Sequence, residues 1–168
     1  MILHTACIKI TFESLRMKYS KLMKERVRRV GVLLRELGFE MLDGELLEDT
    51  YSAGFESTDG FQGGIYIDRD SKFLELAYTF SFSINLADYL QTKLSDILQI
   101  CYEYGCYTNL QTSQREITLS VLSKIYYAGL NYYSLKETVR DYREAVESLV
   151  EVLELRNELG KEAAGGNA

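Results

Sequence analysis

The fold is decided by residues 73–105, FLELAYTFSFSINLADYLQTKLSDILQICYEYG. Large apolar side chains recur at every second position over residues 73–82, which is typical of a strand with one buried face. The buried face is predicted to consist of Leu74, Leu76, Tyr78, Phe80 and Phe82. Apolar residues then recur at helical spacing as far as Gly105, a glycine suited to the left-handed conformation that ends a helix. The stretch therefore predicts a strand that leads directly into a central helix.

The central helix is predicted to begin after Asn85, whose side-chain oxygen can accept hydrogen bonds from the free N–H groups of a first turn. Asp88 adds negative charge at the positive end of the helix dipole. We expect the packed face of this helix to consist of Leu86, Leu90, Leu94, Ile97, Leu98 and Cys101.

A first helix is predicted over residues 17–37, ending at Gly38. One arc of this helix is apolar and contains Tyr19, Met23, Val27, Val30, Leu34 and Leu37. The opposite arc is a basic stripe of Lys21, Lys24, Arg28 and Arg35. Such a stripe on an acidic protein is usually a solvated face, although it could contact nucleic acid or acidic lipid.

Turn residues divide the remaining chain into strands. Residues 46–56, 61–67 and 73–82 predict an antiparallel meander before the central helix, and residues 106–111 and 116–122 predict a hairpin after it. The inner face of that hairpin is expected to carry Ile117, Leu119 and Val121.

A last helix is predicted to open on a capping box from Ser134 to Glu137 and to end near Gly160. Its apolar seam consists of Leu135, Val139, Tyr142, Val146, Leu149 and Leu153. The partner of this seam could be the sheet of the same chain or a second copy of the protein. The predicted order is α-βββ-α-ββ-α, an α+β fold in which helices pack on a twisted antiparallel sheet.

A chain of 168 residues without proline, repeats or a low-complexity linker is expected to form one domain. We expect that domain to span residues 17–160, with residues 161–168 as a flexible tail. Residues 1–16 are expected to be a loosely attached extension, with a possible start of translation at Met17. The alternative is that residues 7–12, CIKITF, form an extra edge strand.

The composition predicts a cytoplasmic protein. The sequence contains no apolar run of the roughly 20 residues that cross a bilayer, so membrane insertion is not expected. Three scattered cysteines do not make a disulfide framework. Residues 1–38 hold 9 Lys and Arg against 3 Asp and Glu, a net +6, whereas residues 39–168 hold 10 against 22, a net −12. An acidic body of this kind repels nucleic acid, and we do not expect nucleic acid as a partner.

Few residues offer catalytic chemistry. His4 and Cys7 with Cys101 and Cys106 could supply four zinc ligands, but Cys101 falls on the apolar face of the central helix, so no metal is expected. Residues 60–64, GFQGG, lack the Lys-Ser/Thr ending of a phosphate-binding loop and predict a hairpin turn instead. No cofactor is expected.

Acid–base chemistry has equally weak support in the sequence. Asp68 and Asp70 flank Arg69 in a predicted turn, where solvated carboxylates are the ordinary case. An enzyme would need a pocket where carboxylates such as Asp68, Glu75 and Glu103 converge.

Tyrosines are the candidate binding residues. Tyr126, Tyr127, Tyr132 and Tyr133 cluster between the last strand and the last helix. Consecutive tyrosines cannot all face one core, and tyrosine provides a large contact area with a polar tip. They form either a partner-binding surface or a seal at the edge of the core.

The phrases LLRELGFEMLDGE, YGCYTNL, ITLSVL and GLNYYSLKETVRDYREAVESL, in this order of elements, resemble a YbjN-type domain over residues 17–155. That bacterial family is regarded as a group of sensory transduction regulators and shares a fold with the type III secretion chaperones. The resemblance implies a regulator or chaperone-like protein without a catalytic signature. The basic first helix and the lack of an effector-binding motif depart from the chaperones.

We therefore expect a non-catalytic module that binds a polypeptide partner, as a homodimer built from helix faces. The alternatives are a small-molecule enzyme with carboxylate chemistry and a nucleic-acid-binding regulator.

Overall fold

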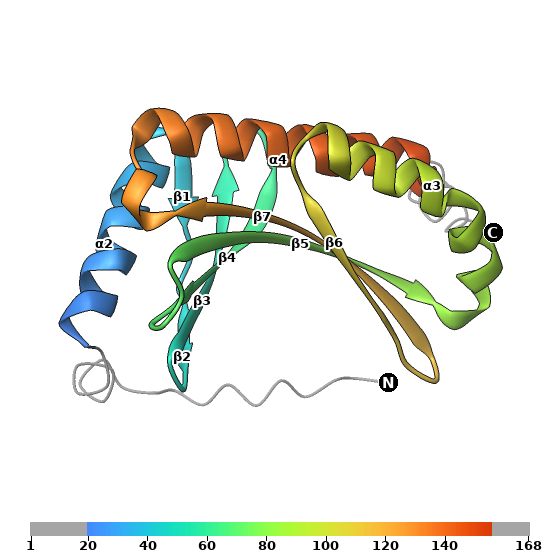
Figure 1. Ribbon diagram of the computed structural model, residues 1–168, viewed down its shortest axis with the longest axis horizontal. Coiled ribbons are helices and arrows are strands. Elements are labelled where there is room, and N and C mark those ends of the chain that lie inside the picture. Colours follow the sequence, from blue (N-terminus) through green and yellow to red (C-terminus); the bar gives the residue numbers. More distant parts are fainter. Residues whose placement is uncertain (1–19, 156–168) are drawn as a thin grey trace, which may run out of the picture.

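The computed structural model describes residues 20–155 (Figure 1). Helices α3 and α4 lie along one face of an antiparallel sheet, and α2 stands at one end of it. The helices are α2 (Lys21–Glu36), α3 (Ala87–Glu103) and α4 (Tyr132–Val152). The strands are β1 (Phe39–Met41), β2 (Glu45–Leu47), β3 (Thr50–Ser57), β4 (Gln62–Asp68), β5 (Phe73–Ser83), β6 (Tyr107–Thr112) and β7 (Glu116–Tyr126).

The α+β class and the predicted order of elements are confirmed, with two short strands added before β3. The strand order is β1-β3-β4-β5-β7-β6, and β2 also pairs with β3. The prediction of one strand over residues 46–56 was wrong because the chain turns sharply within it. Glu48 adopts a φ of 54°, the left-handed conformation that a tight turn requires, and Leu47 then pairs with Thr50.

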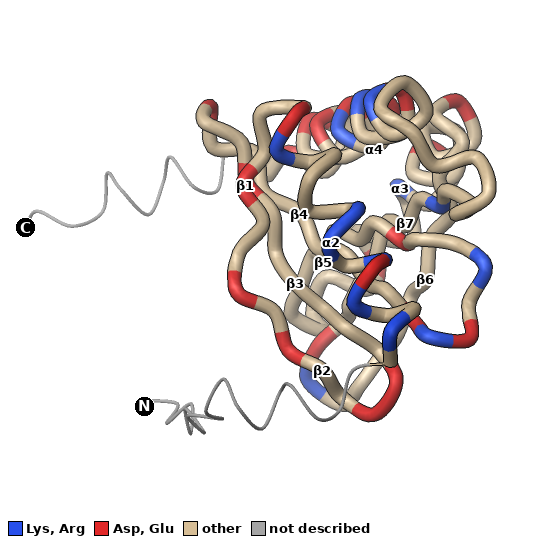
Figure 2. The backbone as a smooth tube through the Cα atoms, turned by 90° about the vertical axis from the view of Figure 1, so that its left-hand side faces the viewer, with Lys and Arg blue, Asp and Glu red and all other residues tan. Residues whose placement is uncertain are grey.

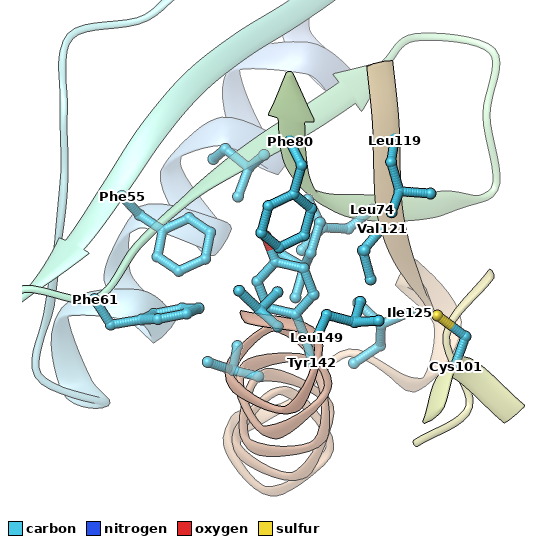
Figure 3. Close-up of a cluster of buried hydrophobic side chains, with 14 of the residues drawn as sticks. Phe55, Phe61, Leu74, Phe80, Cys101, Leu119, Val121, Ile125, Tyr142 and Leu149 are labelled. Carbon is cyan, nitrogen blue, oxygen red and sulfur yellow. The ribbon is translucent and has the colours of Figure 1, made fainter. Parts of the chain in front are cut away.

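The centre of the sheet is the long pairing of β5 with β7, which runs from Phe73 opposite Tyr126 to Ser83 opposite Glu116. The inner faces of both strands are buried as the alternation predicted, except that Tyr78 is only partly buried. Figure 3 shows these side chains meeting those of α4. All six residues of the α4 seam are at most 3% exposed. Within the chain, α4 packs against α3 and β7, so the seam belongs to the core of its own chain.

Helix α2 begins with Ser20 as its N-cap, because the Ser20 side chain accepts a hydrogen bond from the N–H of Met23 at 3.2 Å. Its apolar arc packs on the sheet through Met23, Val30 and Leu34, each at most 2% exposed. The basic stripe faces solvent.

Three predicted helix starts were wrong. Helix α2 begins at Lys21, after its N-cap Ser20, and not at residue 17. A 3₁₀ turn precedes α3, and Ser83 caps that turn, so Asn85 does not cap the helix; α3 itself begins without a side-chain cap. Helix α4 begins three residues earlier than the Ser134 box implied. Asn131 is its N-cap, and its side chain accepts from the N–H of Ser134 at 3.0 Å. The Ser134 hydroxyl accepts from the N–H of Asn131 at 2.9 Å, which closes the box one turn upstream.

Gly105 ends α3 with a φ of 64°, as predicted. In the GFQGG stretch, Gly60 and Phe61 complete the β3–β4 hairpin turn, and Gln62, Gly63 and Gly64 begin β4. Gly63 is required there, because a Cβ at that position would lie 2.6 Å from the Phe55 ring. The expectations for residues 1–16, Met17 and residues 161–168 lie outside the described residues. The prediction that the last helix ends near Gly160 was wrong, because α4 ends at Val152 with Leu153 as its C-cap, and Glu154 then adopts a φ of 57°. No helix within residues 20–155 is long and apolar enough to span a membrane.

Candidate protein-binding surfaces

The four tyrosines lie where β7 ends and α4 begins, beside α2 (Figure 1). Tyr126 is the last residue of β7 and is 62% exposed; Tyr133, in the first turn of α4, is 76% exposed. The Tyr132 and Tyr133 rings meet edge to face with centroids 5.4 Å apart. Tyr126 meets Phe73 in the same way at 6.0 Å. We call these four residues, Tyr126, Tyr127, Tyr132 and Tyr133, the tyrosine cluster.

Tyr127 holds the cluster to the body of the protein. The Arg26 guanidinium stacks on its ring, 4.1 Å from the centroid. Arg26 also donates to the backbone carbonyls of Asp68, at 2.8 Å, and Arg69, at 3.0 Å. The Tyr127 hydroxyl is buried without a hydrogen-bond partner among the described residues, and this burial raises the pKa of Tyr127 to about 12. Arg29 donates to the carbonyl of Leu130, which fixes the loop that follows.

A second surface lies on α3, which runs through the half of the molecule away from the β7–α4 junction (Figure 1). Only three residues of the predicted packed face are buried within the helix: Leu90, Ile97 and Cys101. Leu94 is 41% and Leu98 52% exposed, and Tyr102 continues their line at 83%. Leu86 lies before the helix and is also exposed. The prediction that these leucines pack inside was wrong because the buried face of α3 is turned towards α4, where Tyr89 packs, and Leu94 and Leu98 lie away from it.

The exposed residues of α3 point away from α4. Tyr89 faces α4, since its hydroxyl donates to the carbonyl of Leu153 at 3.1 Å. At about 100° per residue, Leu98 lies half a turn from Tyr89. We call Leu94, Leu98 and Tyr102 the α3 stripe.

Strand β6 is the edge of the sheet next to α3. Its sequence, YTNLQT, contains no charged residue and no proline. Leu110 pairs with the buried Leu119, so it lies on the helix-covered face, yet it is 52% exposed. The sequence predicted the strand but could not show that it forms an edge, because strand order is a property of the whole sheet.

The face of the sheet without helices carries a cluster of Phe73, Glu75, Tyr107 and Lys124. Lys124 Nζ lies 4.4 Å from the Phe73 ring centroid and 4.5 Å from that of Tyr107. The Tyr107 hydroxyl donates to Glu75. Burial and then this hydrogen bond raise the pKa of Tyr107 above its usual value.

The carboxylates of the enzyme alternative do not come together. Asp68 accepts from the Thr50 hydroxyl at 2.9 Å, and this bond is the main reason that its pKa is lowered. Glu75 is held by Tyr107, and Glu103 accepts from Gln99 at 3.0 Å. Two surface hollows are lined by other residues: one of about 240 Å³ between α4 and the β3–β4 turn, and one of about 380 Å³ beside α2 and β1.

The proposed zinc ligands are only partly described. His4 and Cys7 lie outside residues 20–155, and Cys101 is buried. Burial raises the pKa of the Cys106 thiol to about 12, which disfavours the thiolate that binds metal. Within the described residues, no three His, Cys, Asp or Glu side chains form a metal-binding group.

Acidic strands surround the basic helix. Figure 2 shows the basic positions of α2 beside acidic positions of β1, β2 and β3. Glu40 and Glu45 lie on the two short edge strands at this end. This mixture of signs is less favourable for phosphate binding than a purely basic surface.

Comparison with solved structures identifies the fold. YbjN from E. coli, described as a candidate transcription regulator, superposes with a TM-score of 0.54 at 16% identity, covering 79% of this chain and 93% of that one. The chain has the fold of YbjN. The resemblance inferred from the sequence is thus confirmed at the level of the fold.

An uncharacterized protein from Methanothermobacter thermautotrophicus has a similar fold, with a TM-score of 0.60 at 14% identity, covering 79% of this chain and 97% of that one. No family model and no curated protein matches the sequence. The fold is therefore shared by chains with little sequence identity, and neither of these structures is named as an enzyme.

Proposed function

We propose that this chain is a non-catalytic, cytoplasmic regulator or chaperone-like protein that binds a polypeptide partner and acts as a homodimer. The observation that carries the proposal is the exposure of Tyr126 and Tyr133 on a rigidly held junction. The YbjN fold, which includes a candidate regulator, supports a regulatory or binding role.

The tyrosine cluster is suited to binding because its support is already ordered. Arg26 fixes the Tyr127 ring and the β4–β5 turn, and the Asn131 box fixes the start of α4. A partner that packs on Tyr126 and Tyr133 would therefore pay little entropy to order the backbone beneath them. We assign contact to Tyr126 and Tyr133, and a mainly supporting role to the less exposed Tyr127 and Tyr132.

The binding test begins with affinity capture from cell extract and identification of the captured polypeptide by mass spectrometry. A monovalent peptide from that polypeptide is then titrated against the wild type and the double variant Tyr126→Ser, Tyr133→Ser. We expect the dissociation constant to rise tenfold or more, about 1.4 kcal/mol. Unchanged affinity for the double variant would contradict the assignment of the cluster.

The matched control is Tyr102→Ser. Tyr102 is the same residue type and is more exposed, at 83%, but it lies in the last turn of α3 and not at the β7–α4 junction. We expect it to leave the affinity for the peptide unchanged. An equal loss in the control would show that tyrosine exposure, rather than this cluster, governs binding.

A further inference from the structure

The edge formed by β6 and the α3 stripe lacks the features that keep sheet edges apart. Natural edge strands are usually short, charged, interrupted by proline or covered. Strand β6 offers six residues without charge or proline, and Leu110 and the α3 stripe lie exposed beside it. Unpaired backbone groups and apolar side chains therefore lie together at one edge.

The other edge of the sheet is different. It consists of β1 and β2, of three residues each, which carry Glu40 and Glu45. Two copies that met there would bring like charges together on a chain whose net charge is already −6. Electrostatic repulsion thus disfavours the β1–β2 edge, whereas the uncharged β6 strand adds no repulsion.

We propose that β6 pairs with β6 of a second copy, so that the two sheets become continuous and the two α3 stripes pack across a twofold axis. This inference rests on the homodimer of the proposed function and locates it. Antiparallel pairing of one strand with its own copy is self-complementary, as a twofold interface requires.

The dimensions suit a stable dimer. Helix α3, with 17 residues, is about 25 Å long, and strand β6, with six residues, is about 20 Å long. Both lengths are comparable with the width of an interface that buries about 800 Å² per partner. Each copy would contribute four exposed apolar side chains, Leu94, Leu98, Tyr102 and Leu110. The buried centre of such interfaces is apolar, and tyrosine is enriched in them.

The test measures mass by light scattering at micromolar concentration. The wild type should have twice the chain mass of 19.3 kDa. Leu98→Asp places two carboxylates across the twofold axis and should give single chains, with an unchanged circular dichroism spectrum because Leu98 is half exposed. Leu110→Lys places a charge on strand β6 and should likewise give single chains.

The matched control is Leu47→Asp, at the other edge, where Leu47 is 67% exposed; this variant should remain dimeric. Among residues 107–112, the amides that face away from β7 should exchange slowly in the dimer and at least tenfold faster in Leu98→Asp, if β6 is paired. A dimeric Leu98→Asp, or equal exchange in both proteins, would place the interface elsewhere while leaving the homodimer intact. A wild-type mass of 19.3 kDa would reject the homodimer itself, and the peptide titration would still decide partner binding.

Discussion

Tyr142 provides the sharpest test of the packing, because removing its hydroxyl is expected to stabilise the protein. The side chain is 0% exposed, with its ring centroid 6.0 Å from that of Phe61 and 6.5 Å from that of Phe55. Its hydroxyl has no hydrogen-bond partner among the described residues, and burial raises the pKa of Tyr142 well above its usual value. A buried hydroxyl without a partner costs about 1–3 kcal/mol of desolvation.

Tyr142→Phe removes that cost and keeps the ring contacts, so we expect the free energy of unfolding to rise by about 1 kcal/mol. The assay is urea denaturation at fixed protein concentration, where the midpoint should rise and the slope m stay constant. Tyr107→Phe is the matched control: it removes the same atom, but the Tyr107 hydroxyl donates to Glu75, so we expect a loss of about 1 kcal/mol. A loss of stability in Tyr142→Phe would refute the reasoning, since it would show that the hydroxyl is hydrogen-bonded.

Two further predictions concern a surface ion pair and the start of the chain. Asp59 Oδ2 lies 2.8 Å from Arg143, and hydrogen bonds from Arg143 and then Ser57 lower the pKa of Asp59 to about 2. Because the folded pKa lies below the unfolded value, the stabilisation is present above about pH 4 and is lost as the pH falls towards 2. Asp59→Asn should therefore lower the melting temperature at pH 7 but not at pH 2, and an equal effect at both would contradict the ion pair. A chain shortened to begin at Met17 should keep the wild-type melting temperature, whereas a fall of more than about 5 °C would indicate that residues 7–12 pair with the sheet.

The elements with a strict hydrophobic periodicity could be predicted, because the residues that the pattern places on one face are the ones that the fold buries. The alternation in residues 73–82 predicted the buried face of β5, and the seam of α4 is buried at every predicted position. Where two neighbouring residues could each cap a helix, the sequence did not decide between them. Asn131 and Ser134 are both good caps, and the chain uses both in one box, in which Ser134 is the third helical residue.

The surfaces were harder to predict because exposure depends on neighbours that are distant in sequence. Leu94 and Leu98 continue the helical pattern of Leu90, and only the position of α4 on the far side of α3 leaves them exposed. The tyrosine cluster was predicted from the spacing of its tyrosines in the sequence, but the stacking of Arg26 on Tyr127 joins residues about a hundred positions apart and left no local signal.

The positions of the two surfaces make assembly and partner binding separable. Helix α3 and β6 lie at one end of the molecule, and the junction of β7 with α4 lies at the other, beside α2 (Figure 1). A dimer through β6 would therefore leave both tyrosine clusters accessible, one at each end of the continuous sheet. A partner with two binding segments could then engage both clusters, and its second contact would form at a high effective concentration. Leu98→Asp should consequently leave the affinity for a monovalent peptide unchanged while weakening the binding of a bivalent one by at least tenfold. Equal weakening of both peptides would mean that the α3 stripe also supports the tyrosine cluster.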